Sequence, residues 1–356
     1  MSHEAPLQPY IENAQPLTAE AVDSHVANRP IAYYGIMPEG TSAEGRDNHP
    51  PIVIEDESGP TDYSVLISGD LSNVRRVLVR PMSWSEHPGR GFEALREATI
   101  SDRQDDGLAV VGVSFPGAGL NSVGMTAKQR ESLRGKDGDF SYIGNQQWRA
   151  VLQTLGQELA SKGLTPDEVN RKIAGYEYIL AGSSQGASNT VGLLQSAPEG
   201  IVIPQIGLIQ NTGWEHTSRP KFAIRWVQNG SKHFGDYTAA NPYNDYPALG
   251  PGHNTAANIV RNPNSHIGAV VGAMARGGDV DHILSAVQEQ ERHELLTVVA
   301  AAGHDGLSPP EVNKRAATVL AASGLLVRTV VWEGHYHPVM ENLANAKAAF
   351  REVAKY

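Results

Sequence analysis

Short apolar runs recur along most of the chain, and several are followed by segments in which apolar residues have helical spacing. Short runs rich in aliphatic and aromatic residues predict buried strands. Such runs occupy residues 52–54, 63–68, 76–80, 108–113, 176–180, 201–210, 295–302 and 325–332. The first two are separated by Asp-Glu-Ser-Gly-Pro, which predicts a leading antiparallel hairpin.

Helical patterns fill most of the intervals between these runs. In residues 145–161, Trp148, Val151, Leu155 and Leu159 recur at a spacing that places them on one helix face. Further helices are predicted from about residue 92 and over residues 187–197, 309–323 and 341–355. Because strand, helix and strand follow one another, the pattern predicts right-handed parallel crossovers. The expected fold class is therefore α/β, with a mostly parallel central sheet flanked by helices.

The alternation breaks over residues 211–294, where no strand pattern is visible and aromatic residues, Pro, Gly and His are frequent. We interpret this segment as a helical lid, inserted before the penultimate strand between core segments 31–210 and 295–356. The polar residues 1–30 are interpreted as an N-terminal arm. The aromatic side chains of the lid are expected to form either an apolar substrate face or the lid's own core. They are Trp214, Phe222, Trp226, Phe234, Tyr237, Tyr243 and Tyr246.

Composition places the chain among ordinary globular proteins, because 40% of its 356 residues are hydrophobic and 19% are charged. The formal charge of −10, with Lys and Arg scattered along the chain, argues against nucleic acid or anionic lipid as a partner. No apolar run reaches membrane-spanning length. The first residues lack a secretory signal pattern, so a cytoplasmic location is expected. The chain has no cysteine, which excludes a thiol nucleophile and thiolate metal sites.

Residues 176–186, Tyr-Glu-Tyr-Ile-Leu-Ala-Gly-Ser-Ser-Gln-Gly, carry the clearest chemical signal. An apolar run ends there in Gly-Ser-Ser-Gln-Gly, and small residues with helical potential follow. Gly-x-Ser-x-Gly between a strand and a helix is typical of a nucleophile elbow, in which flanking glycines relieve crowding around a strained serine. Ser184 is therefore the candidate nucleophile. The same pattern also occurs in ordinary turns, so partners elsewhere in the chain must support it.

With these features the chain resembles the α/β-hydrolase family over about residues 50–356. Residues 111–122 are similar to the strand and the Pro-Gly-x-Gly-x-Ser loop that precede the elbow in capped members. Residues 301–310 are similar to the acid-bearing loop after the penultimate strand, with Asp305 at the matching position. Residues 332–342 are similar to the loop after the last strand that carries the family's histidine. The order Ser, Asp, His also fits the family.

Two histidines compete for the role of catalytic base. A serine hydroxyl needs an imidazole to accept its proton, and a carboxylate such as Asp305 orients that imidazole. His335 and His337 both follow the last strand, and alternate residues of an extended loop point in opposite directions. The resemblance places the base directly after the glycine at the strand end, which favours His335 and leaves His337 as the alternative.

An oxyanion hole requires backbone N–H donors aimed at the developing negative oxygen. The resemblance implies Gln185, the residue after the nucleophile, as one donor, and the loop after Val79 as the source of the other. Many relatives have His-Gly in that loop, whereas this chain has Arg80-Pro81-Met82, and proline has no N–H. We therefore expect the main chain of Met82 to be the second donor. The alternative is that Met82 only packs under the lid.

These residues predict a serine hydrolase that cleaves a carboxylic ester or related acyl substrate through an acyl-enzyme on Ser184. The same triad also serves acyl transfer and the cleavage of amide or carbon–carbon bonds. A non-catalytic ligand-binding protein of the same fold is the alternative from another class. The expected partner is a small-molecule acyl substrate. No cofactor or metal is expected, because the histidines at positions 216, 233, 253 and 266 lack the tight spacing of metal ligands.

Overall fold

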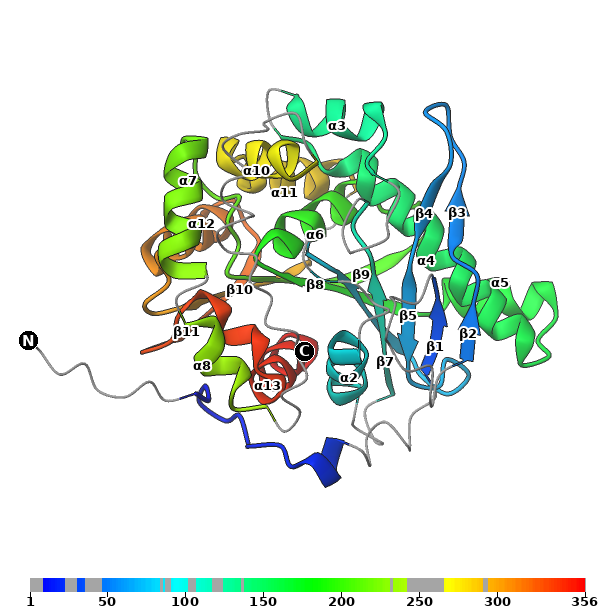
Figure 1. The fold of residues 1–356 in the computed structure, drawn as a ribbon. Helices are drawn as coiled ribbons and strands as arrows, with labels where there is room; N and C mark the ends of the chain where they lie inside the picture. The colour runs from blue at the N-terminus through cyan, green and yellow to red at the C-terminus, as the bar shows by residue number, and fades with distance from the viewer. Residues whose placement is uncertain are drawn as a thin grey trace, which may run out of the picture.

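The computed structural model describes residues 9–22, 31–35, 47–83, 86, 91–101, 107–116, 124–135, 138–230, 233–241, 266–290 and 294–355. Within these residues a nine-stranded sheet runs through the molecule in the order β11-β10-β9-β8-β6-β7-β5-β1-β2 (Figure 1). Its strands are β1 (Ile31–Tyr34), β2 (Asp47–His49), β5 (Val65–Ser68), β6 (Arg76–Pro81), β7 (Leu108–Val113), β8 (Glu177–Ser183), β9 (Val202–Ile209), β10 (Leu296–Ala302) and β11 (Leu326–Trp332).

The six strands from β6 to β11 pair in parallel with one another. β5 is antiparallel to both β7 and β1. β3 (Ile52–Ile54) and β4 (Thr61–Tyr63) form a separate antiparallel hairpin. The sequence predicted residues 63–68 as the second strand of this hairpin, but most of that run is β5, which belongs to the main sheet. The expected mostly parallel sheet is confirmed, and its parallel strands all present their carboxyl ends at one edge.

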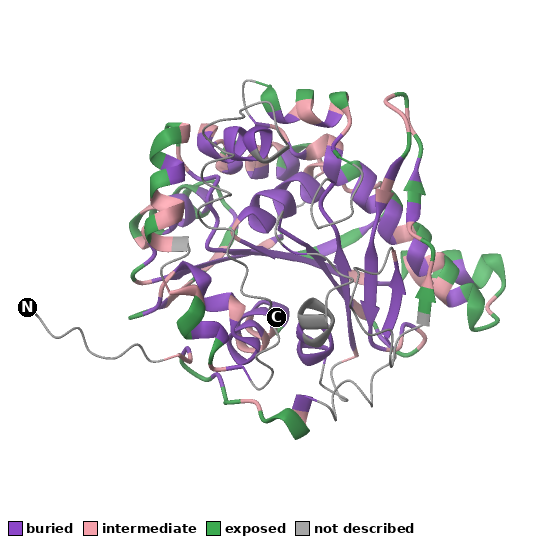
Figure 2. Ribbon diagram, in the orientation of Figure 1, coloured by how far each residue is buried: buried purple, intermediate pink, exposed green. Residues whose placement is uncertain are grey.

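Helices cover both faces of the sheet, which explains why its central strands are buried along almost their whole length (Figure 2). One face packs against α4 (Ser141–Ser161), α6 (Gln185–Gln195), α11 (Asp279–Glu289) and α12 (Pro310–Ala322), through side chains such as Trp148 and Leu320. The other packs against α2 (Gly91–Ile100) and α13 (Leu343–Ala354), through side chains such as Ile100 and Phe350. Further helices are α3 (Ala127–Arg134), α5 (Pro166–Ala174), α7 (Arg219–Arg225), α8 (Phe234–Thr238), α10 (His266–Arg276), the π-helix η1 (Trp226–Gly230) and the 3-10 helix η2 (His337–Glu341).

The described parts of residues 211–294 contain helices and no strand. One of these helices, α11, packs on α6 and places Ile283 and Val287 in the main core. Trp214, Phe222 and Tyr237 are also buried in apolar clusters, so most of the described aromatic side chains of this segment build cores. Tyr243 and Tyr246 lie outside the described residues. The division into core and lid stays a prediction.

The described part of the N-terminal arm, residues 9–22, packs against the helical face formed by α13 (Figure 1). Ile11 and Val22 are buried, which the polar composition of this segment did not indicate. No helix in the described ranges is long and apolar enough to cross a membrane.

Candidate active site

Ser184 occupies a strained turn between β8 and α6. β8 ends at Ser183, α6 begins at Gln185, and Ser184 between them has φ 55° and ψ −122°. A residue with a Cβ rarely adopts a positive φ, and such strain is concentrated at functional sites. The Ser184 N–H donates to the Ile209 carbonyl at 2.8 Å, which ties the turn to the neighbouring strand β9. The geometry is that of the predicted elbow.

The two glycines of the motif are required by the close approach of backbone segments. A Cβ at Gly182 would lie 2.1 Å from the Gly186 carbonyl oxygen, well inside contact distance. A Cβ at Gly186 would lie 2.7 Å from the carbonyl oxygen of Pro81, where β6 ends. The prediction that both glycines relieve crowding is therefore confirmed, and the elbow lies directly against the end of β6.

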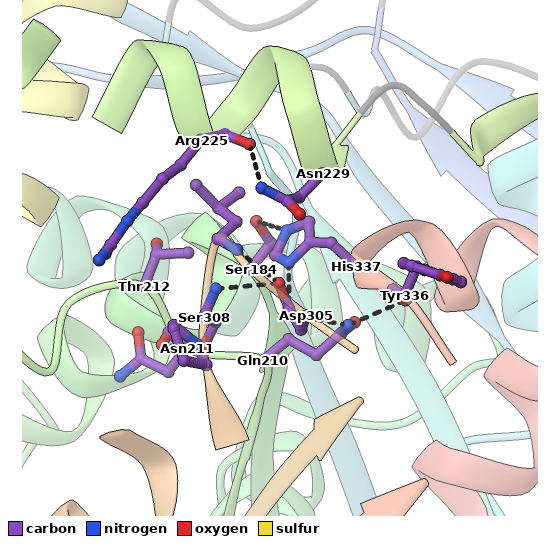
Figure 3. A network of polar contacts seen from close by, with 12 residues as sticks. Ser184, Gln210, Asn211, Thr212, Arg225, Asn229, Asp305, Ser308, Tyr336 and His337 are labelled. Carbon is purple, nitrogen blue, oxygen red and sulfur yellow. Dashed lines mark hydrogen bonds and ion pairs between the residues drawn. The ribbon is translucent and has the colours of Figure 1, made fainter. Parts of the chain in front are cut away.

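Ser184, His337 and Asp305 form a continuous hydrogen-bonded chain (Figure 3). His337 Nε2 is 2.9 Å from Ser184 Oγ, and His337 Nδ1 is 2.8 Å from Asp305 Oδ2. His337 and Asp305 are 6% and 2% exposed, so bulk water does not compete for these contacts. The three side chains come from loops that follow β8, β10 and β11, at the carboxyl edge of the parallel sheet where sites of open α/β folds lie.

The prediction that His335 lies against Ser184 is wrong, because the structure places His337 there. The chain reverses in a turn after β11, in which the His335 N–H donates to the Trp332 carbonyl at 3.4 Å. Gly334 adopts φ 76° within this turn. The turn directs His335 away from Ser184, so that its Nδ1 lies 3.1 Å from the Tyr237 hydroxyl. The side chain that reaches Ser184 is that of His337, two residues further along the chain.

Asp305 has a hydrogen-bond donor on each carboxylate oxygen besides its contact with His337. Oδ1 accepts the N–H groups of Leu307 and Ser308, both at 2.9 Å, as in an Asx turn. Oδ2 also accepts from Gln210 Nε2 at 3.2 Å. These donors hold the carboxylate in place against His337 Nδ1.

Gln210 supports Asp305, and sequence reasoning missed it. It directly follows β9, has φ 51°, and is buried. Its side chain reaches both Asp305 and, at 3.4 Å, the carbonyl of Tyr336. Gln210 thus joins the loop after β10 that carries Asp305 (the acid loop) to the segment after β11 that carries His337 (the base loop). No local sequence pattern indicates this role, because both partners are distant in the chain.

The expectation for Met82 is also wrong, since its N–H already donates to the Val113 carbonyl at 2.9 Å. Pairing with β7 continues past Pro81 and uses this donor. The next N–H, that of Ser83, donates to Glu86 Oε2 at 2.7 Å. Residues 84 and 85 lie outside the described residues. Gln185 begins α6 directly after Ser184, as expected, and its role as an oxyanion donor stays a prediction.

A buried cluster of four charges supports the loop after β6. Arg80 Nε lies 2.5 Å from Glu97 Oε1, and Arg96 Nη2 lies 2.7 Å from Glu86 Oε1. The four side chains are 0–7% exposed, and their charges cancel. The side chain of Arg80 lies entirely within this cluster. Glu86 in turn holds the Ser83 N–H, so the cluster fixes the loop beside the elbow.

We expect Glu86→Gln to destabilise the fold in a pH-dependent way. Burial by itself raises the pKa of Glu86, but Arg96, Arg80 and the Ser83 N–H outweigh burial and lower this pKa from 4.5 to about 2. A carboxyl with a depressed pKa stabilises the fold above its unfolded pKa, and this contribution is lost as the pH falls from about 4.5 to about 2. The shift corresponds to about 3 kcal/mol of unfolding free energy near neutral pH.

Urea unfolding of wild type and Glu86→Gln between about pH 7 and about pH 3 measures this contribution. The difference in unfolding free energy should be largest at neutral pH and should shrink in acid. Glu177→Gln is the matched control, because its partner Arg75 is 79% exposed, and we expect it to cost less than about 1 kcal/mol. Equal losses in the two variants would show that the buried cluster has no special role.

The π-helix η1 lies above the hydrogen-bonded chain (Figure 3). The Trp226 ring is 6.3 Å from the His337 ring, in an edge-to-face arrangement. Asn229 lies against the acid loop so closely that a Cβ at Gly306 would be 2.4 Å from Asn229 Oδ1. Single π turns occur frequently at functional sites. Among the described aromatic residues expected in a substrate face, Trp226 has a ring contact with His337 that fits that role.

A scan against protein-family models and a search of curated proteins found no match to this sequence. Solved structures do match. A thermophilic esterase from Thermogutta terrifontis aligns with a TM-score of 0.50 and 13% identity, over 86% of this chain and 98% of that chain. An esterase from Pyrobaculum calidifontis aligns with a TM-score of 0.48 and 14% identity, over 86% of this chain and 82% of that chain. A thermostable esterase from Pseudomonas putida aligns with a TM-score of 0.46 and 15% identity, over 94% of this chain and 86% of that chain.

The match to the Thermogutta structure and the sheet order give the architecture of the chain. A mostly parallel sheet is flanked by helices on both faces, and a strand-turn-helix elbow lies at its carboxyl edge. The chain has the α/β-hydrolase fold.

Proposed function

We propose that the chain is a serine hydrolase that cleaves a carboxylic ester or related acyl substrate through an acyl-enzyme on Ser184. The observation that carries this proposal is the chain of contacts from Ser184 Oγ through His337 to Asp305, at 2.9 and 2.8 Å. These distances are within the range in which a base and a nucleophile exchange a proton. The esterase activity named for the Thermogutta protein of similar fold supports the same reaction class.

The reaction divides into two acyl transfers. Ser184 Oγ attacks the acyl carbon while His337 Nε2 accepts its proton, and Asp305 holds the Nδ1–H and stabilises the imidazolium. His337 then donates that proton to the departing alcohol, which leaves an ester on Ser184. Water attacks this ester in the second half, again losing its proton to Nε2, and the acid product leaves as Ser184 recovers its proton.

The buried, hydrogen-bonded site favours turnover over simple ligand capture. A protein that only binds an acyl ligand has no use for a strained serine in contact with an oriented imidazole, and strain of this kind costs about 1–3 kcal/mol. Hydrolysis is proposed ahead of acyl transfer and of amide or carbon–carbon cleavage, which the same three residues can also perform.

The test is a panel of p-nitrophenyl esters of graded acyl length, with purified wild-type protein. We expect hydrolysis of at least one ester, with a burst of nitrophenol equal to the enzyme concentration wherever deacylation is slower than acylation. Covalent labelling by a fluorophosphonate at one site per chain is the accompanying result. Folded protein that neither hydrolyses any ester of the panel nor reacts with the fluorophosphonate would contradict the proposal.

A further inference from the structure

His335, which the structure removes from the triad, lies in a buried polar junction instead. Its Nδ1 is 3.1 Å from the hydroxyl of Tyr237, a residue of α8 that is fully buried. The same hydroxyl accepts the backbone N–H of Tyr336 at 3.0 Å. Tyr336 directly precedes His337, so a side chain from α8 contacts the backbone next to the proposed base.

The proton positions in this junction follow from its partners. Burial lowers the pKa of His335, although a hydrogen bond to the backbone of Tyr10 opposes this effect, so the ring is neutral near pH 7. The Tyr237 hydroxyl accepts the Tyr336 N–H, and its own proton points to the ring nitrogen beside it, Nδ1 of His335. Nδ1 then accepts from that hydroxyl, whose pKa burial raises to about 12.

The N-terminal arm is also held near the base loop by hydrogen bonds to Asn345. Asn345 of α13, which is fully buried, accepts the Ile11 N–H at 2.9 Å and donates to the Pro9 carbonyl at 2.8 Å. Its amide also donates to the Val339 carbonyl of η2 at 3.1 Å. The arm therefore contacts the base loop through Tyr10 on one side and through Asn345 on the other.

Both peptide groups that flank Tyr336 are held by side chains from other parts of the chain. Its N–H donates to Tyr237, and its carbonyl accepts from Gln210 at 3.4 Å. Its ring stacks on His233 with centroids 3.7 Å apart. Because a displacement of about 1 Å of a catalytic group can cost about a hundredfold in rate, these contacts bear directly on His337.

We propose that Tyr237 is a positioning residue which, with His335 and the docked N-terminal arm, sets the backbone of the base loop and so the place of His337 relative to Ser184. This inference rests on the proposed function. It makes the arm a structural part of the active site, and it makes α8 an element on which turnover depends. Neither Tyr237 nor His335 touches the substrate in this scheme.

The test compares Tyr237→Phe with Tyr178→Phe. Tyr178 is also buried, and its hydroxyl donates to the Ile173 carbonyl at 2.9 Å on the opposite face of the sheet, so its variant loses one part-buried hydrogen bond away from the site. We expect Tyr237→Phe to lower kcat and the rate of fluorophosphonate labelling by about tenfold to a hundredfold, with KM changed less than about twofold. Tyr178→Phe should leave both rates unchanged at a similar melting temperature.

His335→Gln changes the other partner of the contact between Tyr237 and His335. It is the deciding variant if Tyr237→Phe does not fold. It should also lower kcat and labelling together. Wild-type kcat in folded Tyr237→Phe, or in folded His335→Gln, would overturn the positioning role even if the melting temperature fell. Absence of both ester hydrolysis and labelling in the wild-type protein would instead contradict the proposed function, so the two failures are distinguishable.

Discussion

Ser184→Ala is expected to lower turnover of an activated ester by about a millionfold and to abolish fluorophosphonate labelling, because the variant has no atom that can form the acyl-enzyme. The substitution removes only one oxygen, and alanine is smaller than serine, so the fold should be retained. Labelling followed by intact-mass measurement, with steady-state rates on a p-nitrophenyl ester, gives both results.

Ser183→Ala is the matched control, because it changes the adjacent serine of the same motif. Ser183 is the last residue of β8, whereas Ser184 alone has the positive φ of the elbow. The Ser183 carbonyl, which accepts from Ser83 Oγ at 3.2 Å, is unaffected by the substitution. We expect labelling to persist in Ser183→Ala. Labelling lost there but kept in Ser184→Ala would show that the nucleophile is the other serine.

The parts of the site that the sequence predicted correctly are those encoded locally or by chain order. The elbow is visible because the glycines at 182 and 186, the central serine and the flanking strand and helix are all consecutive in the chain. Asp305 is visible because a parallel sheet places consecutive strand ends side by side, so a loop residue after β10 lies near the loop after β11.

The parts that were missed depend on contacts between distant residues. Both histidines follow the turn at Gly334, and which of them faces Ser184 depends on contacts of His335 with His304 and Tyr237 that the sequence does not indicate. The Met82 N–H is used because pairing with β7 extends past Pro81, which no local pattern indicates. Gln210 and Tyr237 act on residues about 95 to 126 positions away, so their roles appear only in the folded chain.

The second large effect is expected at the base, where the two neighbouring histidines give different outcomes. His337→Ala removes the group that accepts the Ser184 proton, and the loss of a triad histidine costs about a millionfold in kcat when nothing replaces it. Fluorophosphonate labelling should become too slow to detect. His335→Ala leaves the contact between His337 and Ser184 in place and removes only its support, so we expect a loss of about tenfold to a hundredfold.

The rate of fluorophosphonate labelling separates the two roles. In His335→Ala, labelling should be slower than in the wild-type protein but still measurable, because the same general base operates. In His337→Ala, labelling should not be detectable, since no imidazole is left in contact with Ser184. A His335→Ala variant that loses as much activity as His337→Ala, and whose labelling is also undetectable, would show that the base is His335 and that the loop rearranges when substrate binds.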